Sequence, residues 1–227
     1  MGWPAFHLAA LRAGADDGSE IDTLDELRSV VGAAVALSRQ NAIDIISRYD
    51  GTSSTTAPTL ADFSNAGATG VTNTNLASIN TAFAEVGITD SDTTAKIQGV
   101  VSGYESILSG ADGARDGDIV LGESGYLAMG LARIDTSGKA NLLNEIFDGL
   151  PISKVDSYIE LQGAADVVAD IFLAASGAQP QSVLTLARLN SIGLVGVATE
   201  NVALVVEAIT STSDDTIGVD SFIEIQA

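Results

Sequence analysis

At 227 residues, of which 46% are hydrophobic, the chain is long enough to bury a core as one large domain or as two to four small ones. Its formal net charge of −20 disfavours nucleic acids and anionic membrane surfaces as partners, because a strongly negative chain repels phosphate groups. The lack of cysteine excludes disulfide bonds, thiolate catalysis and cysteine-based zinc sites. The sequence contains no stretch of about eighteen uninterrupted apolar residues, so a membrane-spanning helix is not expected.

Residues 1–22 are predicted to form an N-terminal extension. The apolar start has neither a basic region nor a small-residue cleavage site, so it does not have the pattern of a signal peptide. This segment contains the only histidine, His7, and no G-x-S-x-G sequence accompanies it. A serine-histidine-aspartate triad is therefore not expected.

The segment 23–58 is predicted to be a degenerate helical unit. Thr23 and Glu26 have the spacing of a capping box, in which each side chain bonds the other residue's backbone N–H. Asn41 occupies the place that an asparagine holds in the units that follow. The run from Gly51 to Ala57 is rich in serine and threonine and predicts a non-helical linker.

The segment 59–111 shows the pattern of a unit most clearly. It is expected to contain a helix, a glycine bend, a second helix, a polar loop and a third helix, with apolar residues three to four apart. The bend is expected to use glycine because its backbone can turn tightly. An asparagine after the bend and a later glutamine are expected to bond the backbone of the preceding turn. These positions are Thr59, Asp62, Gly67, Gly70, Asn75 and Gln98.

The segment 112–183 is predicted to be a further helical unit that begins with an acidic loop, residues 112–123. Acidic residues stand at loop positions one, five, seven and twelve, and glycine stands at six, as in an EF-hand. Calcium prefers such oxygen ligands, although Ala114 replaces one of them. In the alternative interpretation the loop only links two helices, and Asp118 caps the second. The predicted metal ligands are Asp112, Asp116, Asp118 and Glu123.

The segment 184–227 is predicted to be a last unit that is cut in mid-repeat after its glutamine. It shares a Thr-Leu-Ala start, a G-x-x-G-V bend and an asparagine with the unit that begins at Thr59. The string VDSFIEIQ near its end repeats VDSYIELQ of the preceding unit. In the last unit the bend, asparagine and glutamine positions are Gly193, Gly196, Asn201 and Gln226. In the preceding unit the asparagine and glutamine positions are Asn141 and Gln162.

One run, PTLADFSNAGATGVTNTNLASINTAFAEVGITDSDTTAKIQGVV from Pro58 to Val101, resembles the short helical repeats of very large bacterial surface and biofilm-type adhesins. It departs from them at Phe63, where they have tyrosine, and at Ala68, where they have valine. The resemblance covers about a third of the chain when the last unit is included. It implies a secreted, tandemly repeated, non-catalytic module.

Together these patterns predict an all-α protein made of tandem units of about three helices each, stacked into a bundle or an elongated array. The expected function is that of a non-catalytic spacer or assembly segment of an extracellular or cell-surface adhesin, with calcium as a candidate stiffening ion. Neighbouring repeats of the same or a sister chain are the expected partners. Two alternatives stay open: a module that binds a protein or a glycan, and a self-assembling filament or surface-layer subunit.

Overall fold

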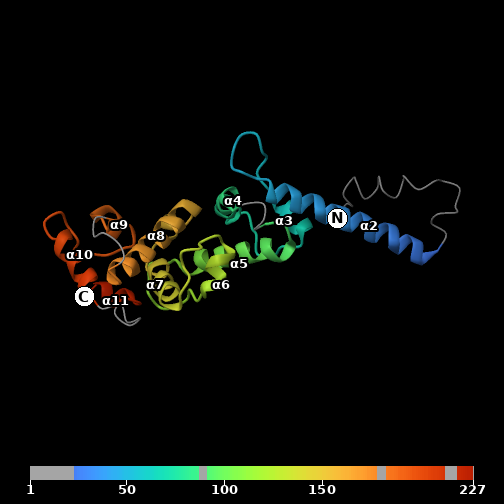
Figure 1. Cartoon of the computed structure of the whole chain (residues 1–227). Coiled ribbons are helices and arrows are strands. Elements are labelled where there is room, and N and C mark those ends of the chain that lie inside the picture. The colour runs from blue at the N-terminus through green and yellow to red at the C-terminus, as the bar shows by residue number, and fades with distance from the viewer. Residues whose placement is uncertain (1–22, 87–90, 178–182, 213–218, 227) are drawn as a thin grey trace.

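The computed structural model describes residues 23–86, 91–177, 183–212 and 219–226, and these ranges contain helices, turns and loops but no strand (Figure 1). The predicted all-α class is confirmed. The helices are α2 (Leu24–Ser47), α3 (Leu60–Ala66), α4 (Leu76–Glu85), α5 (Thr94–Gly110), α6 (Glu123–Ala128), α7 (Ser137–Asp148), the 3-10 helix η2 (Ile152–Lys154), α8 (Tyr158–Ala175), α9 (Leu186–Ser191), α10 (Val202–Ser211) and α11 (Phe222–Gln226).

The helices follow one another along an elongated body. Figure 1 shows α2 projecting at one end, α5, α6 and α7 in the middle, and α9, α10 and α11 at the other end. No helix of the described residues is both long enough and apolar enough to cross a membrane.

Helix α2 begins at the predicted capping box. The Thr23 hydroxyl accepts the N–H of Glu26 at 3.2 Å, and the Glu26 carboxylate accepts the N–H of Thr23 at 2.9 Å. The helix then runs without a bend through Gly32 and Asn41, so the three-helix arrangement expected for 23–58 is wrong. A single glycine costs only about 1 kcal/mol relative to alanine in a helix, and three alanines follow Gly32 closely.

The linker 51–57 is non-helical, as predicted. Its threonines hydrogen-bond the carboxylate at the end of the preceding segment instead of extending a helix. Thr55 and Thr52 donate their hydroxyls to Asp50 at 2.5 and 2.7 Å, and these bonds lower the pKa of Asp50 to about 2.

Helix α3 also begins at a predicted capping box, formed by Thr59 and Asp62. It ends at a bend whose two glycines have positive φ angles, a conformation that other residues adopt only with strain. The bend after α9 has the same two glycines. The φ angles are +85° at Gly67, +93° at Gly70, +82° at Gly193 and +80° at Gly196.

An asparagine side chain holds each of these two bends. Its oxygen accepts an N–H from three residues earlier, and its amide donates to the carbonyl of the second glycine. The bonds are Thr72 N–H to Asn75 (2.7 Å), Asn75 to Gly70 (2.9 Å), Ala198 N–H to Asn201 (2.7 Å) and Asn201 to Gly196 (2.8 Å). The predicted role of asparagine is confirmed at both positions.

A glutamine side chain from a later helix bonds the backbone of the residue just before the second glycine. The N–H of that residue donates to the glutamine oxygen, and its carbonyl accepts from the glutamine amide. Gln98 of α5 bonds Thr69 in this way at 2.8 and 3.1 Å. Gln226 of α11 bonds Val195 at 3.0 and 3.0 Å. The two bends therefore share the same set of side-chain to backbone bonds.

The middle of the chain does not repeat this set of bonds. Asn141 is exposed on α7, and Gln162 bonds Asp166 of its own helix at 3.3 Å, so the predicted roles of both residues are wrong. Ser153 and Asp156 also have the spacing of a capping box in the sequence, but they do not cap α8. Helix α8 begins at Tyr158, and its N-cap is Ser157, whose hydroxyl donates to Glu160 at 2.8 Å.

Two hydrogen bonds between distant helices span the same separation along the chain. The first residue of α8, Tyr158, donates its N–H to the Thr81 hydroxyl of α4 at 2.8 Å. The first residue of α11, Phe222, donates its N–H to the Glu145 carboxylate of α7 at 2.6 Å. Donor and acceptor are 77 residues apart in both cases. Helices α8 and α11, which carry Gln162 and Gln226, thus each begin against a helix that lies much earlier in the chain.

An ion-pair network fixes α8 relative to its neighbours. Asp170 is paired with Arg133 at 2.5 Å and with Arg188 at 2.6 Å, and Arg133 also pairs with Asp166 at 2.9 Å. Burial alone would raise the pKa of Asp170. The hydrogen bonds and positive charges of the two arginines outweigh it, so the pKa lies below its ordinary value of 3.8. The network joins the segment before α7, helix α8 and helix α9.

Candidate functional site

The acidic loop 112–123 lies between α5 and α6, against the end of α7. One isolated β-bridge pairs Asp112 with Pro151. Ile119 is buried against Gly110, at the end of α5. Gly113 and Gly117 have φ angles of +90° and +89°, so the predicted tight turn at Gly117 is present.

Asp148, the last residue of α7, anchors the first half of this loop. Its carbonyl accepts the N–H of Gly113 at 3.2 Å, and its carboxylate accepts the N–H of Gly117 at 2.8 Å. The side chain is almost fully buried, with 2% exposure. The second carboxylate oxygen has no hydrogen-bond partner within the described part of the chain. Sequence reasoning missed this residue because it lies 31 positions after Gly117.

Asn144, one turn earlier on α7, anchors the second half. Its oxygen accepts the N–H of Leu121 at 3.1 Å and the hydroxyl of Tyr126 at 2.7 Å, and its amide donates to the Leu121 carbonyl at 3.0 Å. Tyr126 is fully buried, and burial raises the pKa of its phenol above the ordinary value of 10.0. Asp148 and Asn144 thus fasten both halves of the loop to α7.

We expect Asn144→Ala to lower the free energy of unfolding by about 1–3 kcal/mol, because it leaves the buried Tyr126 hydroxyl and the Leu121 N–H without a partner. Urea unfolding followed by circular dichroism measures the change. Asn141→Ala, on the exposed side of the same helix, is the matched control and should have almost no effect. Equal losses in both variants would contradict this account of the loop.

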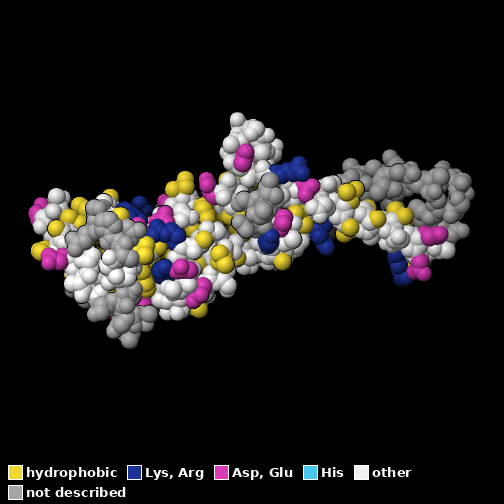
Figure 2. Space-filling view, in the orientation of Figure 1, with side chains coloured by type: hydrophobic (Ala, Val, Ile, Leu, Met, Phe, Trp, Pro, Cys, Tyr) yellow, Lys and Arg dark blue, Asp and Glu magenta, His cyan; other side chains and the backbone are white. Residues whose placement is uncertain are grey.

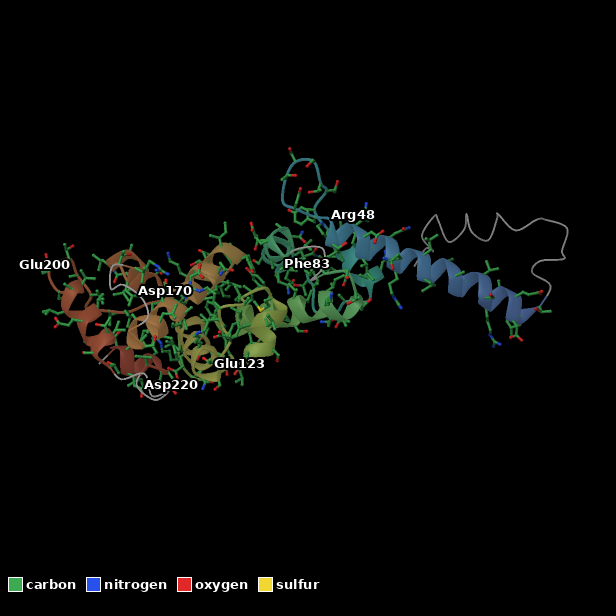
Figure 3. All side chains as sticks on the ribbon, viewed as in Figure 1. Arg48, Phe83, Glu123, Asp170, Glu200 and Asp220 are labelled. Carbon is green, nitrogen blue, oxygen red and sulfur yellow. The ribbon has the colours of Figure 1, made fainter. Side chains whose placement is uncertain are left out.

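The four predicted metal ligands all lie on the exposed side of the loop or at its end. The Asp112 carboxylate accepts the N–H of Ala114 at 2.8 Å, and Glu123 is the first residue of α6 (Figure 3). Gly122 is the N-cap of α6, so the alternative in which Asp118 caps that helix is wrong. Among the described residues, no group of three or more His, Asp or Glu side chains is placed to hold a metal ion.

The aspartates of the loop nevertheless influence one another. Loss of surrounding water and the negative charges of Asp118, Asp148 and Asp112 raise the pKa of Asp116 above its ordinary value of 3.8. A bound cation would relieve this repulsion. The structure therefore brings three of the predicted ligands near the buried Asp148, without assembling them into one centre.

Arg115 is the one basic residue of this loop, and it connects the loop to α11. Its guanidinium lies 3.5 Å from the centre of the Phe222 ring. Burial lowers the pKa of its guanidinium below the ordinary value, while the charges of Glu145 and Asp148 oppose that shift. Arg115 thus places a positive charge beside the anchor of the loop, where an added cation would be repelled.

Other residues considered from the sequence take structural places or fall outside the described ranges. Tyr104, Tyr126 and Tyr158 are buried in the hydrophobic core. His7 lies outside the described residues.

An open groove lies at the far end of the molecule, between α10, α11 and the bend 194–197. It has a volume of about 410 Å³. Leu204 on its rim is 66% exposed, and Figure 2 shows hydrophobic side chains at this end of the molecule. The residues that define this C-terminal groove are Leu194, Leu204, Val205, Ala208, Ile209 and Ile225.

Comparisons of the chain with models of known protein families, with curated proteins and with solved structures gave no match. The assignment of function therefore depends on the geometry described above and on the sequence pattern.

Proposed function

We propose that this chain is a non-catalytic spacer or assembly segment of a secreted bacterial surface adhesin, in which stacked helical units hold distance. The observation that carries the proposal is the pair of bends that share one set of bonds. In each of them a glycine turn is held by an asparagine and by the glutamine of a later helix. The same set of hydrogen bonds at two places 126 residues apart, around Asn75 and around Asn201, is typical of a repeated building block.

The contacts between distant helices support stacking of such blocks. Tyr158 docks on α4 and Phe222 docks on α7 with the same separation along the chain. We interpret α3–α5, α6–α8 and α9–α11 as three successive units, with α2 as a leading helix. The last helix of the second and of the third unit then begins against the middle helix of the unit before it. Contacts between neighbours alone produce an elongated particle.

Small-angle X-ray scattering of the full chain at low concentration tests the spacer role. A compact protein of this length has a radius of gyration of about 17 Å. We expect a clearly larger value and a distance distribution with a long tail, because the units follow one another along a line. A radius of gyration at the compact value would contradict the proposal.

Glycan binding receives less support than a protein partner. Sugar-binding surfaces generally use exposed aromatic rings, whereas the large exposed hydrophobic residues of the described ranges are all aliphatic. The C-terminal groove has the aliphatic lining that suits another helix.

Calcium binding by the acidic loop is the second part of the proposal. The mutual repulsion of Asp112, Asp116 and Asp118 favours a bound cation, whereas the charge of Arg115 opposes it. We expect millimolar calcium to release a measurable heat of binding in titration calorimetry. Asp112→Ala and Glu123→Ala should remove that heat. Glu200→Gln, an exposed carboxylate at the far end of the molecule, should not (Figure 3). No heat with the unmodified chain, or equal heats in all variants, would rule out calcium binding here.

A further inference from the structure

The Arg115 side chain reaches from the acidic loop to a place where three other elements meet. Its guanidinium lies 3.5 Å from the centre of the ring of Phe222, the first residue of α11. A Cβ atom added to Gly149, directly after α7, would lie 2.6 Å from Arg115 Nε. One added to Gly193, in the bend after α9, would lie 3.3 Å from Arg115 Nη2. This one side chain therefore touches the end of α7 and two elements of the last unit, α9–α11.

Gly149 makes room for the guanidinium. Its φ and ψ angles are −80° and −1°, a conformation that residues with side chains also adopt, so the backbone does not require glycine there. The close approach of Arg115 does require it, since a Cβ atom at this position would lie 2.7 Å from Nη2 as well. The absence of a side chain at position 149 is thus explained by the contact with Arg115.

Two carboxylates of α7 attract the charge of Arg115. The negative charges of Glu145 and Asp148 oppose the effect of burial on the guanidinium. Glu145 also accepts the N–H of Phe222 at 2.6 Å, so the same carboxylate attracts the arginine and the first residue of α11. Charge on α7 and contact with the Phe222 ring together hold Arg115 at the junction with the last unit.

Asp148 acts on the acidic loop as well as on Arg115. Its charge, together with those of Asp118 and Asp112, disfavours the ionised form of Asp116. One oxygen of the buried Asp148 carboxylate has no hydrogen-bond partner within the described residues. A cation held by the loop would reduce the negative field that attracts Arg115 and would repel its positive charge.

We propose that Arg115 clamps the last unit to α7, and that a divalent cation bound in the acidic loop weakens this clamp. The inference rests on the calcium binding proposed above and names its mechanical consequence. Two positive charges compete for the field of Asp148, so by thermodynamic linkage each weakens the hold of the other by the same factor. Calcium would therefore loosen the joint before the last unit instead of stiffening it.

Amide hydrogen exchange of the full chain, followed by NMR, tests the clamp. The probes are the N–H of Phe222, bonded to Glu145, and the N–H of Val195, bonded to Gln226. In calcium-free buffer, Arg115→Ala should speed the exchange of both by about tenfold, because these bonds open more often when the last unit is unclamped.

Two controls show whether the effect is local. The N–H of Thr69 makes the equivalent bond to Gln98 in the first unit, so its exchange should not change in Arg115→Ala. Arg28→Ala removes an exposed arginine that pairs with Asp25 of its own helix, and it should leave all three amides unchanged. Equal rates for the Phe222 amide in Arg115→Ala and the unmodified chain would overturn the clamp.

Gly149→Ala separates the clamp from a general loss of packing. In the unmodified background the added methyl group displaces the guanidinium, so the Phe222 amide should exchange as fast as in Arg115→Ala. In the Arg115→Ala background the same substitution should add nothing, because no guanidinium remains to be displaced. Effects of the two substitutions that simply add would contradict the clamp.

Calcium tests the coupling. In titration calorimetry, Arg115→Ala should bind calcium about fivefold or more tightly than the unmodified chain. Saturating calcium should speed exchange of the Phe222 amide by about the same factor in the unmodified chain and leave it unchanged in Arg115→Ala. Slower exchange in calcium would overturn the proposal.

The failure of this inference can be told apart from the failure of the calcium site. If the unmodified chain releases heat with calcium but Arg115→Ala has the same affinity, the coupling is wrong and the calcium site stands. If the unmodified chain releases no heat, both the calcium site and the coupling are wrong. The scattering experiment on the spacer role is independent of both outcomes.

Discussion

Placing a carboxylate at Ala82 is expected to abolish or severely weaken folding, whereas the same substitution at Ala208 should be almost neutral. Ala82→Asp buries a charge in the apolar contact of α4 with α5 and α8, at a cost of at least about 3 kcal/mol. Ala208→Asp introduces an exposed aspartate into a helix, which costs about 0.5 kcal/mol.

Thermal and urea unfolding, followed by circular dichroism at low protein concentration, measure this pair. Both positions begin as alanine in a ten-residue helix that follows an asparagine, so helix propensity and side-chain size are matched. Equal destabilisation of the two variants would show that α10 is covered as fully as α4, and would contradict the exposure of Ala208 in an open groove.

The second large effect is expected from Asp170→Asn. The substitution removes the negative charge that Arg133 and Arg188 share, and we expect a loss of about 2–4 kcal/mol near neutral pH. The pKa of Asp170 is lowered in the folded chain, so its stabilising contribution is fully present above the ordinary value of 3.8 and disappears as the pH falls through the lowered value.

The pH dependence separates this mechanism from a packing defect. The stability difference between the unmodified chain and Asp170→Asn should be constant from pH 7 to about 5 and should shrink below about pH 4. Asp135→Asn is a suitable comparison, because Asp135 pairs with one lysine and its side chain is 64% exposed. It should cost at most about 1 kcal/mol. A difference for Asp170→Asn that persists unchanged into acid would argue against the ion pairs as its cause.

Local signals in the sequence predicted the parts of the fold that depend on neighbours along the chain. The capping boxes at Thr23 and Thr59 and the positive φ angles at Gly67 and Gly193 follow from residue type and spacing alone. The continuous helix through Gly32 was not predicted, because a single glycine is a weak helix breaker and the surrounding alanines favour the helix.

The candidate loop shows the opposite limit. Its acidic spacing is visible in the sequence, but its anchors, Asp148 and Asn144, lie on a later helix and reach it only through tertiary contact. The EF-hand spacing ignores both of them, and it also ignores Arg115, whose charge stands beside Asp148. The signal that could have indicated this anchoring is the spacing of Asn144 and Asp148, which lie four residues apart and so share one face of α7.

The docking of Phe222 on Glu145 bears on the order in which the chain acquires its structure. The acceptor is synthesised 77 residues before the donor, as is Thr81 before Tyr158. A chain leaving the ribosome would therefore find each landing surface already in place when the helix that needs it emerges. Synthesis from the N-terminus would lay down such a protein vectorially, with every newly released helix guided by an older one.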